Sequence, residues 1–212
     1  FFFTHTPPPP ILSGLVGSEM CIRDRATSHT GSMLIIDEAY LSFVANPWNS
    51  LSMLKYSNIM LIRSMTKNYA NTALRLGYAV ASADIVSKIR ALQPDWSVNS
   101  LAQKVGIAAL EDNEYLSNAR RVVFSARSYL KKALTELGLE TIPSDANFLL
   151  IKVDNASKWR YLLLKKGVVV RDCSSFGLPN YIRVGIRVIE DCKILVEAIT
   201  KVSEKPIDDY ND

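Results

Sequence analysis

Short apolar runs alternate with longer amphipathic segments along most of the chain, and this alternation is typical of an α/β protein. Residues 33–37, 58–64 and 77–82 are predicted strands, and the first ends in an acid, as expected of a buried parallel strand whose carboxyl end reaches a site. The clearest helix spans 115–137, where apolar residues recur at steps of three and four, and Gly138 stands where its cap is expected. The opposite face of this helix is basic, and we expect it to be solvated: Arg120, Arg121, Arg127, Lys131 and Lys132.

A smaller unit of strands and helices is predicted beyond this helix. Residues 146–153 and 167–172 have strand patterns, with a helix between them that ends near Lys166. Residues 181–187 form a further predicted strand, and residues 189–202 a closing helix.

The strand at 181–187 carries two arginines on one face. Its period of two places Arg183 and Arg187 beside the small Gly185, while the apolar residues face the other way. Two cations next to a glycine predict an anion receptor on this face.

The first 25 residues break from this organisation. Three phenylalanines, four prolines and a glycine-spaced apolar patch make neither a helix nor a strand pattern, and the basic start of a signal peptide is missing. The ending SEMCIRDR resembles translated adaptor sequence, so we expect residues 1–25 to be non-native and the protein's own N-terminal part to be missing. Residues 203–212 are expected to form a polar tail.

Composition favours a folded protein and argues against several classes of partner. Hydrophobic residues make up 48% and charged residues 22% of 212 residues, which favours a folded chain over a disordered one. The net charge of +4 is spread along the chain, which argues against a nucleic-acid surface. Three separated cysteines and two histidines offer no metal-ligand pattern, and no apolar run approaches the ~20 residues of a membrane span. We therefore expect a cytoplasmic protein with no metal, nucleic-acid or membrane partner.

Two short segments carry the candidate chemistry. Asp37 ends one predicted strand and Lys67 lies just past the next, with Ser64 before it and Arg75 eight residues after it. Pyridoxal 5′-phosphate (PLP) chemistry needs a lysine for the Schiff base, a carboxylate against the pyridine nitrogen, and hydroxyl and guanidinium donors for the phosphate. This set of groups favours a PLP site over surface or capping roles for the same residues.

DEAY at 37–40 followed by RSMTKNYANTALRLGY at 63–78 resembles the cofactor segment of class I and II aminotransferases, in particular the group of histidinol-phosphate aminotransferase and threonine-phosphate decarboxylase. The resemblance, which covers about residues 33 to 200, implies PLP fold type I: the C-terminal part of the large domain over 26–112 and the small domain over 113–202. It implies that Lys67 binds the cofactor and shuttles a proton, and that Asp37 pairs with the pyridinium nitrogen.

The same resemblance implies roles for the neighbouring residues. Tyr40 would donate a hydrogen bond to the 3′-oxygen of the ring, and Ser64 and Arg75, with Thr66 as a weaker candidate, would hold the phosphate. The family usually has alanine-glycine before the leucine-arginine, whereas this chain has Thr72-Ala73, which puts the local turn in question.

Three segments of the second half, at 94–103, 144–152 and 168–187, are similar to this group as well. They imply that Arg183 binds the substrate α-carboxylate and Arg171 a distal substrate phosphate. Arg187 is an extra cation, and a second arginine there resembles the decarboxylase more than the aminotransferase.

The function expected from this resemblance is transamination of a phosphorylated amino compound by a PLP-dependent homodimer. Decarboxylation of such a compound is the first alternative, since the sequence does not show which bond to the α-carbon is broken. The second is a fragment without activity, because an aromatic residue that stacks on PLP and a glycine-rich phosphate turn are expected upstream and are not identifiable. A PLP-binding transcriptional regulator is a third, with no helix-turn-helix pattern in its favour.

Overall fold

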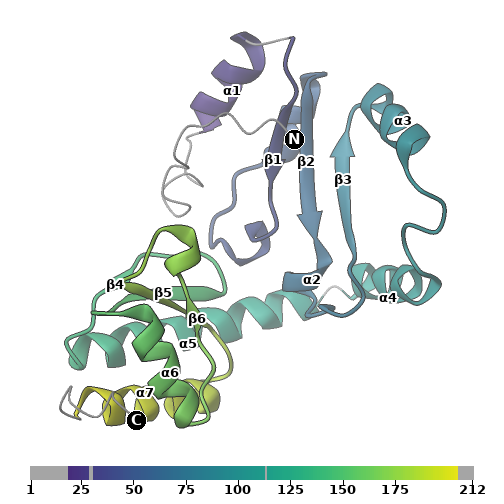
Figure 1. The fold of residues 1–212 in the computed structure, drawn as a ribbon. Helices are drawn as coiled ribbons and strands as arrows, with labels where there is room; N and C mark the ends of the chain where they lie inside the picture. The colour runs from purple at the N-terminus through teal and green to yellow at the C-terminus, as the bar shows by residue number, and fades with distance from the viewer. Residues whose placement is uncertain (1–18, 29–30, 113, 205–212) are drawn as a thin grey trace. The chain divides into compact units, whose positions relative to one another are not determined.

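The chain forms two compact units (Figure 1). The computed structural model describes residues 19–28, 31–112 and 114–204. The first unit runs to Leu41 and resumes over Asn46–Glu111. The second holds Ser42–Ala45 and the chain from Asp112 onward.

The first unit is built on a three-stranded sheet in the order β1-β2-β3. β1 (Leu34–Asp37) runs parallel to β2 (Ile59–Ser64), and β3 (Gly77–Ala81) is antiparallel to β2. Asp37 is paired with Ile62, and Ser64 with Gly77. The last residues of β1 and β2 therefore lie at the same end of the sheet, as the sequence predicts for a site at strand ends.

One face of this sheet is covered and the other is largely open. Helix α1 (Glu19–Ser28) and the 3₁₀ helix η3 (Ser50–Lys55) supply Ala26 and Met53 to a core that Ile59 and Leu61 complete. On the opposite face, Ile35 of β1 is 52% exposed. β1 is parallel to β2 as predicted, but the prediction that it is buried is wrong, because β1 is an edge strand that only one layer of the described residues covers.

The remaining helices of the first unit lie around the sheet. They are α2 (Met65–Asn68), α3 (Ala83–Leu92) and α4 (Ser100–Glu111), while η2 (Leu41–Phe43) spans the boundary between the two units. Figure 1 shows α2 at the end of β2, where the arrow of that strand points.

The N-terminal pattern needs one correction. Glu19–Ser28 form α1, although no helix was expected up to residue 25. Ile22 of this helix is partly buried against the core that contains Ala26, and this packing supplies what the weak local pattern lacks. The rest of the expected non-native segment, residues 1–18, lies outside the described residues, as does the polar tail from residue 205.

The second unit contains a four-stranded antiparallel sheet in the order β4-β5-β7-β6. Its strands are β4 (Thr141–Ile142), β5 (Phe148–Lys152), β6 (Arg171–Asp172) and β7 (Tyr181–Gly185). Ile182 and Val184 are buried and pair with the buried Ile151 and Leu149, which confirms the predicted apolar face of β7. Arg183 therefore lies on the other face, as expected.

Three helices accompany this sheet: α5 (Tyr115–Glu136), α6 (Ala156–Lys165) and α7 (Ile189–Ser203), with the 3₁₀ helix η4 (Ser174–Phe176) after β6. α7 packs against α5 and α6, and α6 contacts β6 and β7. On the basic face of α5, Arg121, Lys131 and Lys132 are exposed as expected, but Arg127 is not. The Arg127 side chain is only 12% exposed and donates hydrogen bonds to the carbonyls of Asp145 and Ala146.

The predicted strand at 167–172 is shorter in the structure because its first half closes α6. Gly167 has a φ of 79°, its N–H donates to the Leu164 carbonyl, and the Val168 N–H donates to the Leu163 carbonyl. These bonds cap the helix, so only Arg171 and Asp172 pair with β7.

The cap of α5 leads to a first testable expectation. Gly138 follows the helix with a φ of 74°, and its N–H donates to the Thr135 carbonyl, as the sequence predicts. We expect Gly138→Ala to lower the free energy of unfolding by about 1 kcal/mol, because a Cβ is unfavourable in the left-handed region. Urea unfolding measures the change, with Glu136→Ala as the control. Equal stability of the two variants would show that the cap geometry does not constrain the fold.

Candidate functional site

The carboxyl ends of β1 and β2 carry the predicted cofactor residues. The ladder continues one residue beyond β1, since the Glu38 N–H donates to the Ile62 carbonyl at 2.8 Å. Asp37 is exposed, and its Oδ1 accepts a hydrogen bond of 2.9 Å from the Ala39 N–H. This local turn fixes the start of the DEAY segment and leaves the second carboxylate oxygen for another partner.

Lys67 lies on α2, the short helix that follows β2 without a linker. Ser64 has extended backbone angles and caps the helix, because its Oγ accepts the Thr66 N–H at 3.3 Å. The hydroxyls of Ser64 and Thr66 are 2.7 Å apart, so the structure brings the two hydroxyl candidates together. The Met65 N–H donates to the Leu76 carbonyl and ties this turn to the chain before β3.

Lys67 and Tyr40 come together from the ends of the two strands. The Lys67 Nζ lies 5.8 Å from the centroid of the Tyr40 ring, within the range of a cation–π contact. The two residues are 27 positions apart in the sequence, and the parallel pairing of β1 with β2 is what joins them.

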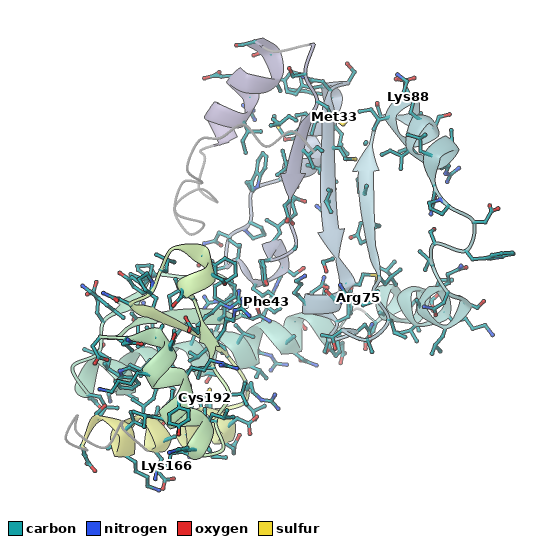
Figure 2. The ribbon with its side chains drawn as sticks, in the orientation of Figure 1. Met33, Phe43, Arg75, Lys88, Lys166 and Cys192 are labelled. Carbon is teal, nitrogen blue, oxygen red and sulfur yellow. The ribbon has the colours of Figure 1, made fainter. Side chains whose placement is uncertain are left out.

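Arg75 ends the turn that precedes β3. In Figure 2 it lies at the end of the sheet opposite Met33, which is the end where β1 and β2 finish. Its backbone is left-handed, with a φ of 54°, and its Nη1 donates to the Thr72 carbonyl at 3.0 Å. A non-glycine residue in this region costs on the order of 1 kcal/mol and is typical of functional sites.

The turn around Thr72 and Ala73 forms despite the departure from the family pattern. The Thr72 N–H donates to the Ala70 carbonyl and the Leu74 N–H to the Asn71 carbonyl. The glycine that the local packing requires is Gly77, where a Cβ would lie 2.8 Å from the Arg63 carbonyl oxygen.

A part-buried ion pair, which the sequence does not reveal, lies beside these residues. The Arg63 Nε donates to the Glu38 Oε2 at 2.9 Å. Burial acts to lower the pKa of the Arg63 guanidinium, but the hydrogen bonds with Glu38 and Tyr78 and the charge of Glu38 outweigh it and raise that pKa. Glu38, which lies inside the DEAY segment, is therefore a buried charge whose partner comes from the neighbouring strand.

In the second unit, Arg171 and Arg183 are directly opposite each other on β6 and β7. The Arg183 guanidinium lies 5.1 Å from the Phe148 ring centroid and that of Arg171 lies 5.4 Å from the Phe176 centroid. Arg171 Nη2 also donates to the Ser175 Oγ at 3.0 Å. Like charges opposite each other repel in a sheet, and an anion held between them would remove that repulsion.

Arg187 does not share this arrangement, so its predicted place on the strand is wrong. β7 ends at Gly185, and Arg187 lies between the strand and α7. Its Nε donates to the Oδ2 of Asp191 at 2.5 Å. Asp191 lies four residues further on, in the first turn of α7. The strand pairing ends with the Ile186 N–H, which donates to the Asn147 carbonyl, so Arg187 lies just beyond the ladder and before α7.

The carboxylate next to Arg171 organises the loop after β6. Asp172 accepts hydrogen bonds from the hydroxyls of Ser157 and Ser174, at 2.5 and 2.6 Å, and from the Ser174 N–H at 2.8 Å. The Ser157 hydroxyl, followed by the two Ser174 donors, lowers the pKa of Asp172 to about 2 from 3.8.

This lowered pKa gives an expected pH dependence. The carboxylate is ionised more readily in the folded chain, so its bonds stabilise the fold fully above about pH 4 and progressively less as the pH falls toward 2. We expect Asp172→Asn to reduce thermal stability at pH 7, with a difference from the parent that disappears near pH 2. The exposed Asp95→Asn is the control. A loss of stability that is the same at every pH would assign the effect of Asp172→Asn to packing instead.

Cys173 is buried, and burial raises the pKa of its thiol, in keeping with a packing residue. Within the described ranges, no group of three or more His, Cys, Asp or Glu residues could hold a metal ion. None of the described helices has both the length and the apolar character to cross a membrane.

Comparison with known proteins identifies the family. The sequence profile of aminotransferase class I and II matches residues 20–199. Histidinol-phosphate aminotransferase of Symbiobacterium thermophilum is 35% identical over 170 residues, which are 79% of this chain and 47% of that protein. The same enzyme of Methanopyrus kandleri is 32% identical over 193 residues, 88% of this chain and 49% of that protein. The chain thus spans about half the length of these relatives.

Solved structures of similar proteins have the same fold. Histidinol-phosphate aminotransferase from Clostridium acetobutylicum superposes with a TM-score of 0.83 at 27% identity, covering 93% of this chain and 62% of that one. L-threonine-O-3-phosphate decarboxylase from Porphyromonas gingivalis gives 0.78 at 24% identity, covering 88% and 59%, and supports the fold alone. The predicted α/β fold type I is confirmed, and the chain belongs to the class I and II aminotransferase family.

Proposed function

We propose that this chain is part of a PLP-dependent aminotransferase that acts on a phosphorylated amino compound. The observation that carries the proposal is the position of Lys67, just past β2 and 5.8 Å from the Tyr40 ring centroid, at the sheet end that also holds Asp37 and Ser64. The relatives above 30% identity that carry the name histidinol-phosphate aminotransferase supply the substrate class.

The residues present fit PLP in their chemistry. The exposed carboxylate of Asp37 suits a pyridinium nitrogen, and the paired hydroxyls of Ser64 and Thr66 suit a phosphate group. Arg75 adds a guanidinium, and the backbone of this residue is held in the left-handed region. These groups belong to one compact unit and one end of its sheet.

When bound, PLP supplies a protonated ring that accepts the electron pair left at the substrate α-carbon. The carboxylate of Asp37 would keep the ring nitrogen protonated by its negative charge. The Lys67 amine would hold the cofactor and carry the proton to and from the α-carbon, and the Tyr40 hydroxyl would donate a hydrogen bond to the ring oxygen. Ser64, Thr66 and Arg75 would bind the phosphate.

Arg183 and Arg171 are the proposed anion-binding residues for the substrates, Arg183 for an α-carboxylate, as in threonine phosphate or an amino-acid co-substrate, and Arg171 for a phosphate. Their opposition across β6 and β7 supports this role, since a shared anionic substrate relieves their repulsion. Arg187 is the weakest of the three, because Asp191 already neutralises it.

Decarboxylation of a phosphorylated amino acid is the second candidate, because it requires the same lysine and the same carboxylate against the ring nitrogen. Transamination ranks first because the named relatives above 30% identity are aminotransferases. A homodimer with shared sites is proposed with either reaction.

Product analysis distinguishes these reactions. The chain is loaded with PLP and mixed in separate samples with histidinol phosphate and with threonine phosphate. Transamination converts the cofactor to its amino form, measured by chromatography, whereas decarboxylation releases carbon dioxide and leaves the aldehyde form. We expect the amino form with histidinol phosphate. No change of the cofactor with either compound would contradict an active chain and favour the inactive fragment.

A further inference from the structure

An ion pair between a half-buried arginine and a buried carboxylate lies on the covered face of the sheet, behind the candidate cofactor residues. Glu38 follows Asp37 in the sequence, and Arg63 precedes Ser64. Because Asp37 is paired with Ile62, the next step of the parallel ladder places Glu38 beside Arg63. The Arg63 Nε and the Glu38 Oε2 are 2.9 Å apart, and the two side chains are 26% and 2% exposed.

The pair is anchored on a third element. The Arg63 Nη2 donates to the Oγ of Ser50 at 3.3 Å, and Ser50, on η3, is 1% exposed. The other carboxylate oxygen, Glu38 Oε1, is buried and accepts no hydrogen bond within the described residues. The charge of Glu38 is therefore compensated by Arg63, and the two side chains hold each other in place.

We propose that the Glu38–Arg63 ion pair is a positioning clamp that sets the placement of Asp37 relative to Ser64 and Lys67, an inference that rests on the proposed function. Successive residues of a strand point to opposite faces, so a link on the covered face fixes the backbone of residues that face the cofactor. Neither Glu38 nor Arg63 touches the cofactor in this role. Small displacements of such groups are known to weaken binding and chemistry.

If the Glu38–Arg63 pair only stabilised the fold, a different result would be expected. Replacing a buried ion pair by apolar side chains of similar size is often neutral for stability, whereas removing one partner leaves an unpaired charge. The double variant Glu38→Met with Arg63→Met should therefore stay folded but lose the link between the two strand ends. If the ion pair acts as a clamp, this variant binds the cofactor more weakly than the parent at unchanged thermal stability.

The test titrates the full chain with PLP and follows absorbance and Lys67 labelling, with thermal unfolding in parallel. We expect the double Met variant to raise the apparent Kd about tenfold, the scale of losses seen when groups that orient a ligand-binding residue are removed. The pH at which the bound cofactor changes absorbance, which reports the charge next to its ring nitrogen, should shift as well. Glu38→Gln, which keeps an acceptor for the Arg63 Nε, should retain nearly the parent affinity.

Glu140→Met with Lys152→Met removes another 2.9 Å ion pair, in the second unit, and should leave PLP binding unchanged. If the double Met variant does not fold, Glu38→Gln with Arg63→Lys, which keeps polar groups but shortens the reach, decides by the same criterion. Equal PLP affinity of parent and folded variant overturns the clamp while the proposed function stands. A parent chain that does not label at Lys67 overturns the proposed function, and the clamp with it.

Discussion

Replacing Lys67 with alanine is expected to abolish the borohydride-stable PLP adduct of this chain. The expectation follows from chemistry as well as position, since only a primary amine forms a Schiff base with the cofactor aldehyde. Lys67 is placed for that role by the junction of β2 with α2 and by its contact with the Tyr40 ring. The intact mass after reduction measures the result.

Two further variants separate the amine from its charge and its surroundings. Lys67→Arg keeps a cation beside Tyr40 and should bind PLP without forming an adduct. Lys55→Arg is the matched control, because the Lys55 Nζ lies 5.1 Å from the Tyr56 ring centroid in the same unit but away from the strand ends. An unchanged adduct yield in Lys67→Ala, or a loss of adduct in Lys55→Arg, would contradict the assignment of Lys67.

Asp37→Asn is expected to weaken PLP binding by about 10- to 100-fold, the equivalent of one charge-assisted hydrogen bond. Asparagine keeps an oxygen for the Ala39 N–H, which Asp37 Oδ1 accepts at 2.9 Å, so the local turn should persist. The variant therefore removes the charge next to the pyridine ring and little else. Equilibrium titration with PLP measures the loss.

The control for this variant is Asp84→Asn, since Asp84 is an exposed carboxylate of the same unit that pairs with Lys88 on α3. It should bind PLP as the parent does. Equal affinity of Asp37→Asn and the parent would remove Asp37 from the proposed site and leave the ring nitrogen without an assigned partner.

Much of the fold was accessible from the sequence because it depends on local periodicity. The apolar alternation of β7 and the three- and four-residue steps of α5 are local signals, and each is confirmed, as is the cap at Gly138. The predicted strand at 167–172 failed for a reason that is also local, since Gly167 and Val168 complete the cap of α6. A strand pattern and a helix-cap pattern overlap at these residues, and the N–H groups of Gly167 and Val168 bond to the end of α6.

The ion pair and the buried arginine were not accessible in this way. Glu38 and Arg63 are 25 residues apart and meet only through the parallel register of β1 and β2, which no local pattern reveals. Arg127 looked like one more cation on a solvated helix face, but the carbonyls of Asp145 and Ala146 lie beside it in the folded unit. In each case the deciding contact depends on tertiary pairing.

The contact of Lys67 with Tyr40 could be predicted in part from the sequence. The chemistry of the DEAY and SMTK segments suggested that they act together, and the structure brings these two side chains within 5.8 Å. The sequence alone offered no measure of that distance, because it depends on how far β1 and β2 extend before they end.

The measurement that tests the central claim most directly is the site of PLP attachment. The full chain is mixed with PLP, reduced with borohydride, digested and mapped by mass spectrometry across its thirteen lysines. The proposal requires labelling concentrated at Lys67 and lost in Asp37→Ala and Arg75→Ala. Labelling scattered over the exposed lysines of a chain shown to be folded would contradict a cofactor site at the ends of β1 and β2.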